Sequence, residues 1–316
     1  MNNENAMRSK NLDLELMRIL ACFFVIFNHT GNNGFFLFSS YDNHSLQFWV
    51  YLFISVFCKF SVPLFFAITG ALMLNRERES LKKLWSHRVA KMIMILFVWS
   101  LLYYLLGIYK GEHSFTLTQF LKQWYSSDWN FSFWYLYAYI PLIMTLPILQ
   151  CIAKSVDDKT YVYMFGLIMV FGSIIPIVQF WAFKGELHLN GNFNINWMST
   201  QIFLYPLLGY FLQHRIRKTF WTGRCICGLW IINLATIIVS CYMTYYRAVI
   251  MGELNEGVSQ SFHNTFVIIN TISVFALCKY LALKISHRCE GAVNMIKSIG
   301  GGHSAFTFYI YGYCTE

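Results

Sequence analysis

The segment Phe57–Leu74 reads FCKFSVPLFFAITGALML and carries a single charged residue, Lys59. It makes up the last two thirds of an apolar run over 48–74, and a helix needs about 20 apolar residues to cross a bilayer. Comparable runs lie at 12–30, 89–109, 133–153, 161–183, 197–213, 225–247 and 263–283, and a ninth begins near Ile299. The sequence therefore predicts an all-α, polytopic transmembrane bundle of about nine membrane helices.

The charge distribution supports a membrane protein and predicts its orientation. Charged residues make up 12% of the chain, whereas a soluble domain has about 25%. If the N-terminus is cytoplasmic, most of the 24 lysines and arginines fall in inner segments, as the positive-inside rule requires. The outer segments then keep Lys110, Lys122, Lys184 and Arg247. Topology thus accounts for the net charge of +9, and we expect a multi-pass protein of the cell (plasma or inner) membrane with no nucleic-acid partner.

The remaining composition predicts neither a metal site nor a disulfide. Most of the nine cysteines lie inside apolar segments, where they act as small packing residues. Cys225 and Cys227 form only a CxC pair, which lacks zinc-ligand spacing. The N-terminus MNNENAMRSK is polar and lacks a following h-region with a small-residue cleavage site, so no cleavable signal peptide is expected. No permanently bound cofactor is predicted.

The connecting segments contain two further features. The outer segments Thr30–Gln47, Gly111–Ser132 and Lys184–Asn196 are polar and aromatic, and they are long enough to roof a cavity that opens outward. Arg76–Trp85 is charged with spaced apolar residues, which predicts an amphipathic helix on the inner surface. Neither a linker nor a repeat is evident, so a single domain over residues 1–316 is expected.

The first span carries charges that a membrane helix tolerates only toward a bundle interior or a water-filled cavity. Arg18 and His29 are eleven residues apart, which is an advance of about 16.5 Å and close to three helical turns. They therefore share one stripe, and Glu15 lies near it, one turn before Arg18. A cation at the inner face and an imidazole across the membrane suit a long substrate with an anionic head and a reactive tail, such as acyl-CoA. The alternative is that Arg18 snorkels to the interface and His29 only forms an interfacial hydrogen bond.

Two further sites of positive charge have a functional and a structural interpretation. Lys59 is expected near mid-bilayer, where Pro63 cannot donate to its carbonyl. It requires a partner or a cavity, unless its stem reaches up to the outer surface. Arg88 and Lys91 open the third span and suit phosphates, although positive charge is expected there in any case.

Four motifs together resemble the acyltransferase 3 family, in particular its surface-polysaccharide O-acyltransferase branch. The first is ELMRILACFFVIFNH (Glu15–His29), with the family's acidic residue, arginine and histidine. The second is KFSVPLFFAITGALML (Lys59–Leu74), with Thr69 where the family usually has serine. The third is the basic pair of the third span, and the fourth is FWYLYAYIPLIMTLPIL (Phe133–Leu149). The likeness by motif covers about residues 10–150.

The resemblance implies transfer of an acyl group, usually acetyl, from cytosolic acetyl-CoA to a hydroxyl of a cell-envelope glycan or its lipid-linked precursor. In that case His29 is the general base, Lys59 stabilises the oxyanion, and Arg18 binds the phosphates of CoA. The implied substrate-binding residues are Glu15, which orients Arg18, together with Arg88, Lys91, Ser61 and Trp134. Direct transfer is preferred, and an acyl-imidazole on His29 is the alternative.

The C-terminus departs from the family pattern of ten membrane helices. The chain ends in AFTFYIYGYCTE (Ala305–Glu316), without the histidine that closes the family's last segment, so either the closing helix is dispensable or the domain is truncated there. Two other functions are open at this point. One is a transporter or flippase for a lipid-linked glycan, which predicts inverted repeats and paired broken helices. The other is a membrane subunit without enzymatic activity.

Overall fold

The computed structural model describes residues 12–29, 34–112, 114–130, 133–183, 189–190, 192–193, 195–254 and 264–286. Throughout these ranges the regular secondary structure is helical. The chain forms two compact units, residues 1–72 with 156–316, and residues 73–155. We call them unit 1 and unit 2.

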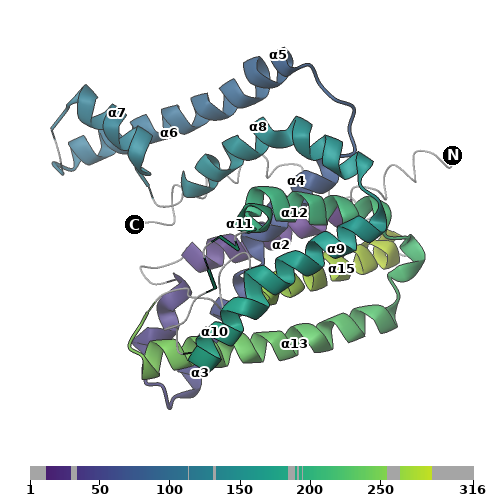
Figure 1. Cartoon of the computed structure of the whole chain (residues 1–316). Coiled ribbons are helices and arrows are strands. Elements are labelled where there is room, and N and C mark those ends of the chain that lie inside the picture. Colours follow the sequence, from purple (N-terminus) through teal and green to yellow (C-terminus); the bar gives the residue numbers. More distant parts are fainter. Residues whose placement is uncertain are drawn as a thin grey trace. The chain divides into compact units, whose positions relative to one another are not determined.

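Unit 1 contains fourteen helical segments within the described ranges. They are α2 (Leu12–His29), η1 (Gly34–Ser40), α3 (Leu46–Cys58), α4 (Ser61–Met73), α9 (Asp158–Met169), η4 (Val170–Ile174), α10 (Ile175–Phe183), α11 (Asn196–Ser199), α12 (Gln201–Tyr210), η5 (Phe211–Arg215), η6 (Lys218–Phe220), α13 (Gly223–Tyr245), η7 (Tyr246–Ile250) and α15 (Thr265–Ser286). Helix α15 packs along both α13 and α2, and α13 packs on α3 (Figure 1). Aromatic and aliphatic side chains of η1, α3 and α13 form a core, which includes Phe38, Phe48, Leu52 and Ile237.

The apolar run over 48–74 is not one uninterrupted helix. It breaks at Lys59 and Phe60, between α3 and α4. The break follows from Pro63, which has no N–H to donate to the carbonyl of Lys59. At the end of α3, the carbonyl of Phe57 accepts a hydrogen bond from a side chain. The donor is Asn270 Nδ2 of α15, at 2.7 Å. Asn233 of α13 donates to Asn270 Oδ1 in turn, at 3.2 Å, so two buried amides hold the end of α3.

Helices α4 and α12 cross in backbone contact. A Cβ atom added at Gly70 would lie 2.0 Å from Pro206 O, and one at Gly209 would lie 1.9 Å from Ala67 O. No other residue type fits at these positions without separating the helices. Thr69 turns its hydroxyl to its own helix and donates to Phe65 O at 2.9 Å. The Thr-Gly pair of the second motif is therefore explained here by packing.

Unit 2 consists of α5 (Leu81–Lys83), the π-helical segment η2 (Leu84–Val89), α6 (Ala90–Tyr109), α7 (Leu117–Ser126) and α8 (Trp134–Ser155). The short helix α7 packs its aromatic side against α6 (Figure 1), with Phe97 in edge contact with Phe120 and Trp124. The segment between α4 and α5 is tied to α8 by Gln150, which donates to Met73 O at 2.9 Å, and by Lys154, which donates to Arg76 O at 2.7 Å.

Six of the helices in the described ranges are long and apolar enough to cross a membrane. They are Leu46–Met73, Leu81–Tyr109, Trp134–Ser155, Asp158–Ala182, Gly223–Ile250 and Thr265–Ile285. Helix α2 is not among them, because Asp13, Glu15 and Arg18 interrupt it, and the run 197–213 is divided into α11, α12 and η5. The expected span near Ile299 and the C-terminal motif lie outside the described residues. The fold is thus an all-helical membrane protein, and the count of nine spans stays a prediction.

The prediction of an amphipathic surface helix over Arg76–Trp85 is wrong. Residues 77–80 are not helical, and the helix that begins at Leu81 continues into the span Leu81–Tyr109. Ser80 caps this helix by accepting from Lys83 N at 3.4 Å, so the charged residues before it form a connection between helices.

Candidate functional site

Helix α2 carries the charged residues of the first motif on its first two turns. The predicted contact between Glu15 and Arg18 is present, with Arg18 Nη1 donating to Glu15 Oε1 at 2.6 Å. Both side chains are partly exposed. The second oxygen of Glu15 is buried, and no described residue donates to it. The carboxylate therefore holds the guanidinium through one oxygen and leaves the other nitrogens of Arg18 outside this pair.

Arg18 and His29 lie on the side of α2 that faces the protein. Between them on the same stripe, Cys22 and Val25 are buried. The exposed side chains of this helix, Phe23 at 58% and Phe27 at 39%, lie roughly on the opposite side, at 100° per residue. The apolar aromatic face is thus directed to the surroundings, and the stripe with the arginine and the histidine is turned inward.

His29 and Lys59 meet at the ring of Phe35. Lys59 Nζ lies 3.6 Å from the centroid of this ring. The imidazole of His29 is in edge contact with the same ring, with centroids 6.2 Å apart. The ammonium of Lys59 is close enough to act electrostatically on His29. The structure therefore brings together two predicted residues from separate elements, α2 and the break between α3 and α4.

Lys59 is almost completely buried, at 1% exposure, so its stem does not reach the outer surface. An aromatic face stabilises a desolvated ammonium by about 2 kcal/mol. Phe35 is itself held in place, because Ser55 Oγ of α3 donates to Phe35 O at 2.6 Å. Ser61, the first residue of α4, is buried beside the break.

Phe35 and Ser55 are the residues of this cluster that the sequence did not single out. The segment Thr30–Gln47 was expected to roof a cavity, but its many aromatic residues give no signal of which one contacts Lys59. Ser55 lies in an apolar run, where a lone serine is ordinary. Only the fold identifies these two residues.

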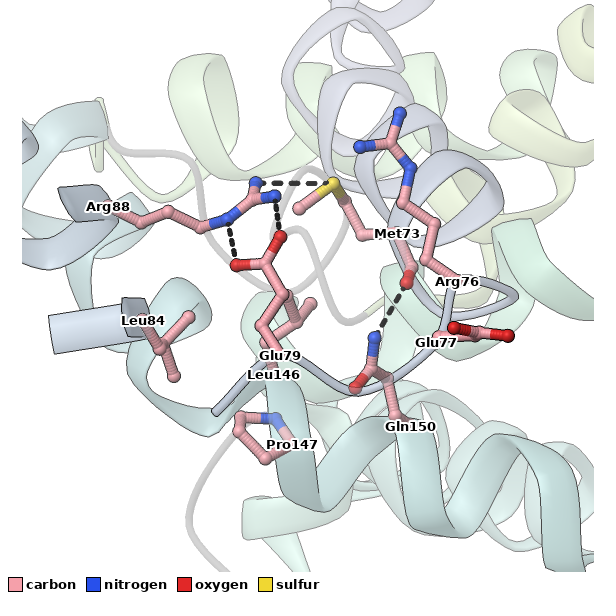
Figure 2. A pocket seen from close by; sticks show the side chains of 9 residues that line it. All are labelled: Met73, Arg76, Glu77, Glu79, Leu84, Arg88, Leu146, Pro147 and Gln150. Carbon is pink, nitrogen blue, oxygen red and sulfur yellow. Dashed lines mark hydrogen bonds and ion pairs between the residues drawn. The ribbon is translucent and has the colours of Figure 1, made fainter. Parts of the chain in front are cut away.

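The basic pair of the third span lies in unit 2. Arg88 belongs to the π-helical segment η2 and forms a bidentate ion pair with Glu79 (Figure 2), at 2.8 Å from Nε to Oε2 and 2.5 Å from Nη2 to Oε1. This pair lowers the pKa of Glu79, which lies outside the spans, chiefly through the hydrogen bond from Arg88. Lys91 is exposed on α6, and Trp134 is the partly buried first residue of α8.

A buried polar cluster near the start of α2 was not predicted. Asp13 accepts from Leu14 N at 2.9 Å and from Gln213 Nε2 at 3.0 Å. Lys279 of α15 donates to the carbonyls of Leu212 and Gln213 at 3.2 and 3.3 Å, and it interacts electrostatically with Asp13. Three elements, α2, η5 and α15, are thus joined at the start of α2. Among the described residues, no group of three or more histidines, cysteines and acidic residues is arranged to hold a metal.

Comparison with known proteins identifies the family. A family model described as an acyltransferase domain, Acyl_transf_3, matches residues 11–311. No curated protein and no solved structure matched the chain. The match to the family model covers nearly the whole chain. It includes α2 with its arginine and histidine and the broken helix with Lys59. This chain therefore belongs to the acyltransferase 3 family and is a multi-pass membrane acyltransferase that acts on groups other than aminoacyl groups.

Proposed function

We propose that this acyltransferase moves an acyl group, acetyl in the first instance, from acyl-CoA to a hydroxyl of a cell-envelope glycan or its lipid-linked precursor. This assigns it to the surface-polysaccharide O-acyltransferase branch of its family and to the plasma membrane. Acyl-CoA and the glycan are then its substrates, and no permanently bound cofactor takes part.

The observation that carries the proposal is the inward stripe of α2. Arg18, with its guanidinium steered by Glu15, and His29 lie on the protein-facing side, about 16.5 Å apart along the axis. A CoA thioester has its phosphates at one end and the reactive carbonyl at the other. The stripe supports binding of the phosphates by Arg18 while the acyl arm extends toward His29. The water-accessible tunnel that this requires stays a prediction.

In the proposed reaction, a ring nitrogen of His29 accepts the proton of the sugar hydroxyl. The hydroxyl oxygen then attacks the thioester carbonyl carbon, and the ammonium of Lys59 stabilises the negative charge on the carbonyl oxygen. The carbon–sulfur bond breaks, the acyl ester is formed, and the thiolate of CoA takes the proton from the imidazolium. Phe35 contacts both side chains and supports this assignment by fixing them near each other.

The remaining substrate-binding residues are proposals of the same kind. Arg88 and Lys91 are proposed phosphate ligands within unit 2, where Arg88 is a bidentate donor of the kind that phosphates prefer. Ser61, beside the break, and Trp134, at the start of α8, are proposed substrate contacts. The N-terminus is proposed to be cytoplasmic with nine spans, so that the charged start of α2 faces cytosolic CoA.

The direct test is His29→Ala with His44→Ala as the matched control, because His44 is an exposed histidine of an outer segment. His29→Ala is expected to abolish O-acetylation of the envelope glycan, measured by NMR of the purified glycan, while the protein still fractionates with membranes. His44→Ala is expected to retain acetylation. Acetylation that survives in His29→Ala would remove this residue from the mechanism.

A further inference from the structure

A small cavity in unit 2 encloses the Glu79–Arg88 ion pair (Figure 2). Its volume is about 20 Å³, which is room for a single water molecule. The apolar lining comes from the end of α4, the start of η2 and α8, and the polar lining comes from the connection after α4, from η2 and from α8. The lining residues are Met73, Arg76, Glu77, Glu79, Leu84, Arg88, Leu146, Pro147 and Gln150.

Glu79 occupies the edge of Arg88 that recognises a phosphate. Nε and Nη2 both donate to its carboxylate, and this two-nitrogen edge is the one that binds phosphate in a bidentate manner. The third nitrogen, Nη1, faces Met73 Sδ at 3.8 Å, and a thioether is a weak acceptor. Because Nε and Nη2 both donate to Glu79, a phosphate can bind this edge of Arg88 in a bidentate manner only if the carboxylate leaves.

The two partners differ in how easily they can move. Arg88 is set in η2, at the base of the long helix that continues through α6. Glu79 belongs to the non-helical connection over residues 77–80, whereas the exposed fraction of the two side chains is the same, 31% each. The carboxylate can therefore rotate into solvent without breaking a helical hydrogen bond, whereas the guanidinium keeps its place.

We infer that Glu79 is a latch that closes the Arg88 site in the absence of donor and is displaced by a phosphate of acyl-CoA. This inference rests on the proposed function, in which Arg88 binds such a phosphate. The carboxylate stands in for the anion, so that the cation remains paired in the empty enzyme. When the donor enters, its phosphate replaces the carboxylate of Glu79 at Arg88. Because the Glu79–Arg88 ion pair has to be broken first, Glu79 reduces the net affinity for CoA.

The test measures CoA binding to the full chain in nanodiscs by calorimetry. Glu79→Gln is expected to bind CoA about two- to fivefold more tightly than the unchanged protein, which corresponds to the strength of a half-exposed ion pair. Glu77→Gln is the charge-matched control, because Glu77 lines the same cavity and no described residue forms an ion pair with it. Equal gains in both variants would indicate general electrostatics and overturn the latch.

A double-mutant cycle tests whether the gain in affinity in Glu79→Gln comes from Arg88, which loses its ion pair in that variant. In an Arg88→Gln background, which has no cation for Glu79 to cover, Glu79→Gln is expected to give no gain in affinity. A gain that persists there, or a loss of affinity in Glu79→Gln alone, overturns the inference while leaving the proposed function intact.

Inorganic pyrophosphate serves as a second probe, so that failure of the two proposals can be told apart. If the unchanged protein and the variants bind no CoA, but Glu79→Gln binds pyrophosphate more tightly than Glu77→Gln does, the latch stands and the acyl-CoA donor is wrong. If Glu79→Gln gains affinity for neither anion, the latch is wrong.

Discussion

At the scale of single residues, Lys59 and Lys279 are both buried in the described part of unit 1, and they make different contacts. Lys59 lies on the ring of Phe35, whereas Lys279 interacts with the carboxylate of Asp13 and donates to two carbonyls. Removing a buried donor leaves its acceptors unsatisfied, which costs about 1–3 kcal/mol for each buried group. The same substitution therefore tests a proposed catalytic role at Lys59 and a structural role at Lys279.

Lys59→Met is expected to abolish acyl transfer while the protein still fractionates with membranes, because the proposed stabiliser of the oxyanion is removed. Lys279→Met is expected to lower the melting temperature, because the carbonyls of Leu212 and Gln213 lose their donor and Asp13 loses a nearby positive charge. Thermal unfolding in detergent, combined with an acetyl-transfer assay, measures both effects. Full activity in Lys59→Met would exclude the proposed oxyanion role.

Glu79 allows a prediction about pH at the same scale. Its pKa is lowered from the ordinary value of 4.5, mainly by the hydrogen bond from Arg88. A carboxyl whose pKa is depressed in the folded state adds stability above the ordinary pKa and loses it as pH falls through the lowered one. The difference in melting temperature between the unchanged protein and Glu79→Gln should thus be constant from pH 8 to about pH 5. It should shrink only in more acidic solution, and a decline near neutral pH would contradict the assignment.

At the scale of elements, the crossing of α4 and α12 depends on two glycines. Gly70→Ala places a methyl group 2.0 Å from Pro206 O, so two backbones have to separate. Such overpacking costs about 1–3 kcal/mol or more. A loss of thermal stability, and with it of folded protein in the membrane, is the expected result. Gly166→Ala on α9 is the control: an added Cβ meets nothing within 4 Å there, and the substitution should stabilise by up to about 1 kcal/mol. Equal stability of the two variants would show that the crossing tolerates a side chain.

The same elements indicate what the sequence could predict. Periodicity gave the inward stripe of α2 and the Glu15–Arg18 pair, because both depend on spacing within one helix. Pro63 indicated a freed carbonyl at Lys59, and the break lies there. The ring under Lys59, the amides that hold Phe57 O and the cluster around Asp13 join segments far apart in the chain. Helical periodicity within one segment gives no information about contacts between distant segments, so these contacts could not be predicted.

At the scale of the whole molecule, the division into two units could not be predicted from the sequence either. Unit 2 begins as α4 ends and closes after α8, only a few residues before α9 begins at Asp158. Neither boundary has a linker of distinct composition, so the single domain that was expected remains a prediction beside the family model over 11–311. Charge distribution, by contrast, is a property of the entire chain, and it carries the proposed orientation.

That orientation yields a prediction for the intact protein. With a cytoplasmic N-terminus, the segments around His44 and Glu112 face outward, and those around Glu77 and Asp157 face the cytosol, because the inner segments hold most of the lysines and arginines. Alkaline phosphatase fused after residue 44 or 112 should be active, since this enzyme requires the oxidising exterior to form its disulfides. Fluorescent protein fused after residue 77 or 157 should be bright, and exchanging the reporters should abolish each signal. The inverse pattern would place Arg18 on the outer side, away from cytosolic CoA, and the acyl-CoA mechanism would then fail whatever the geometry of α2.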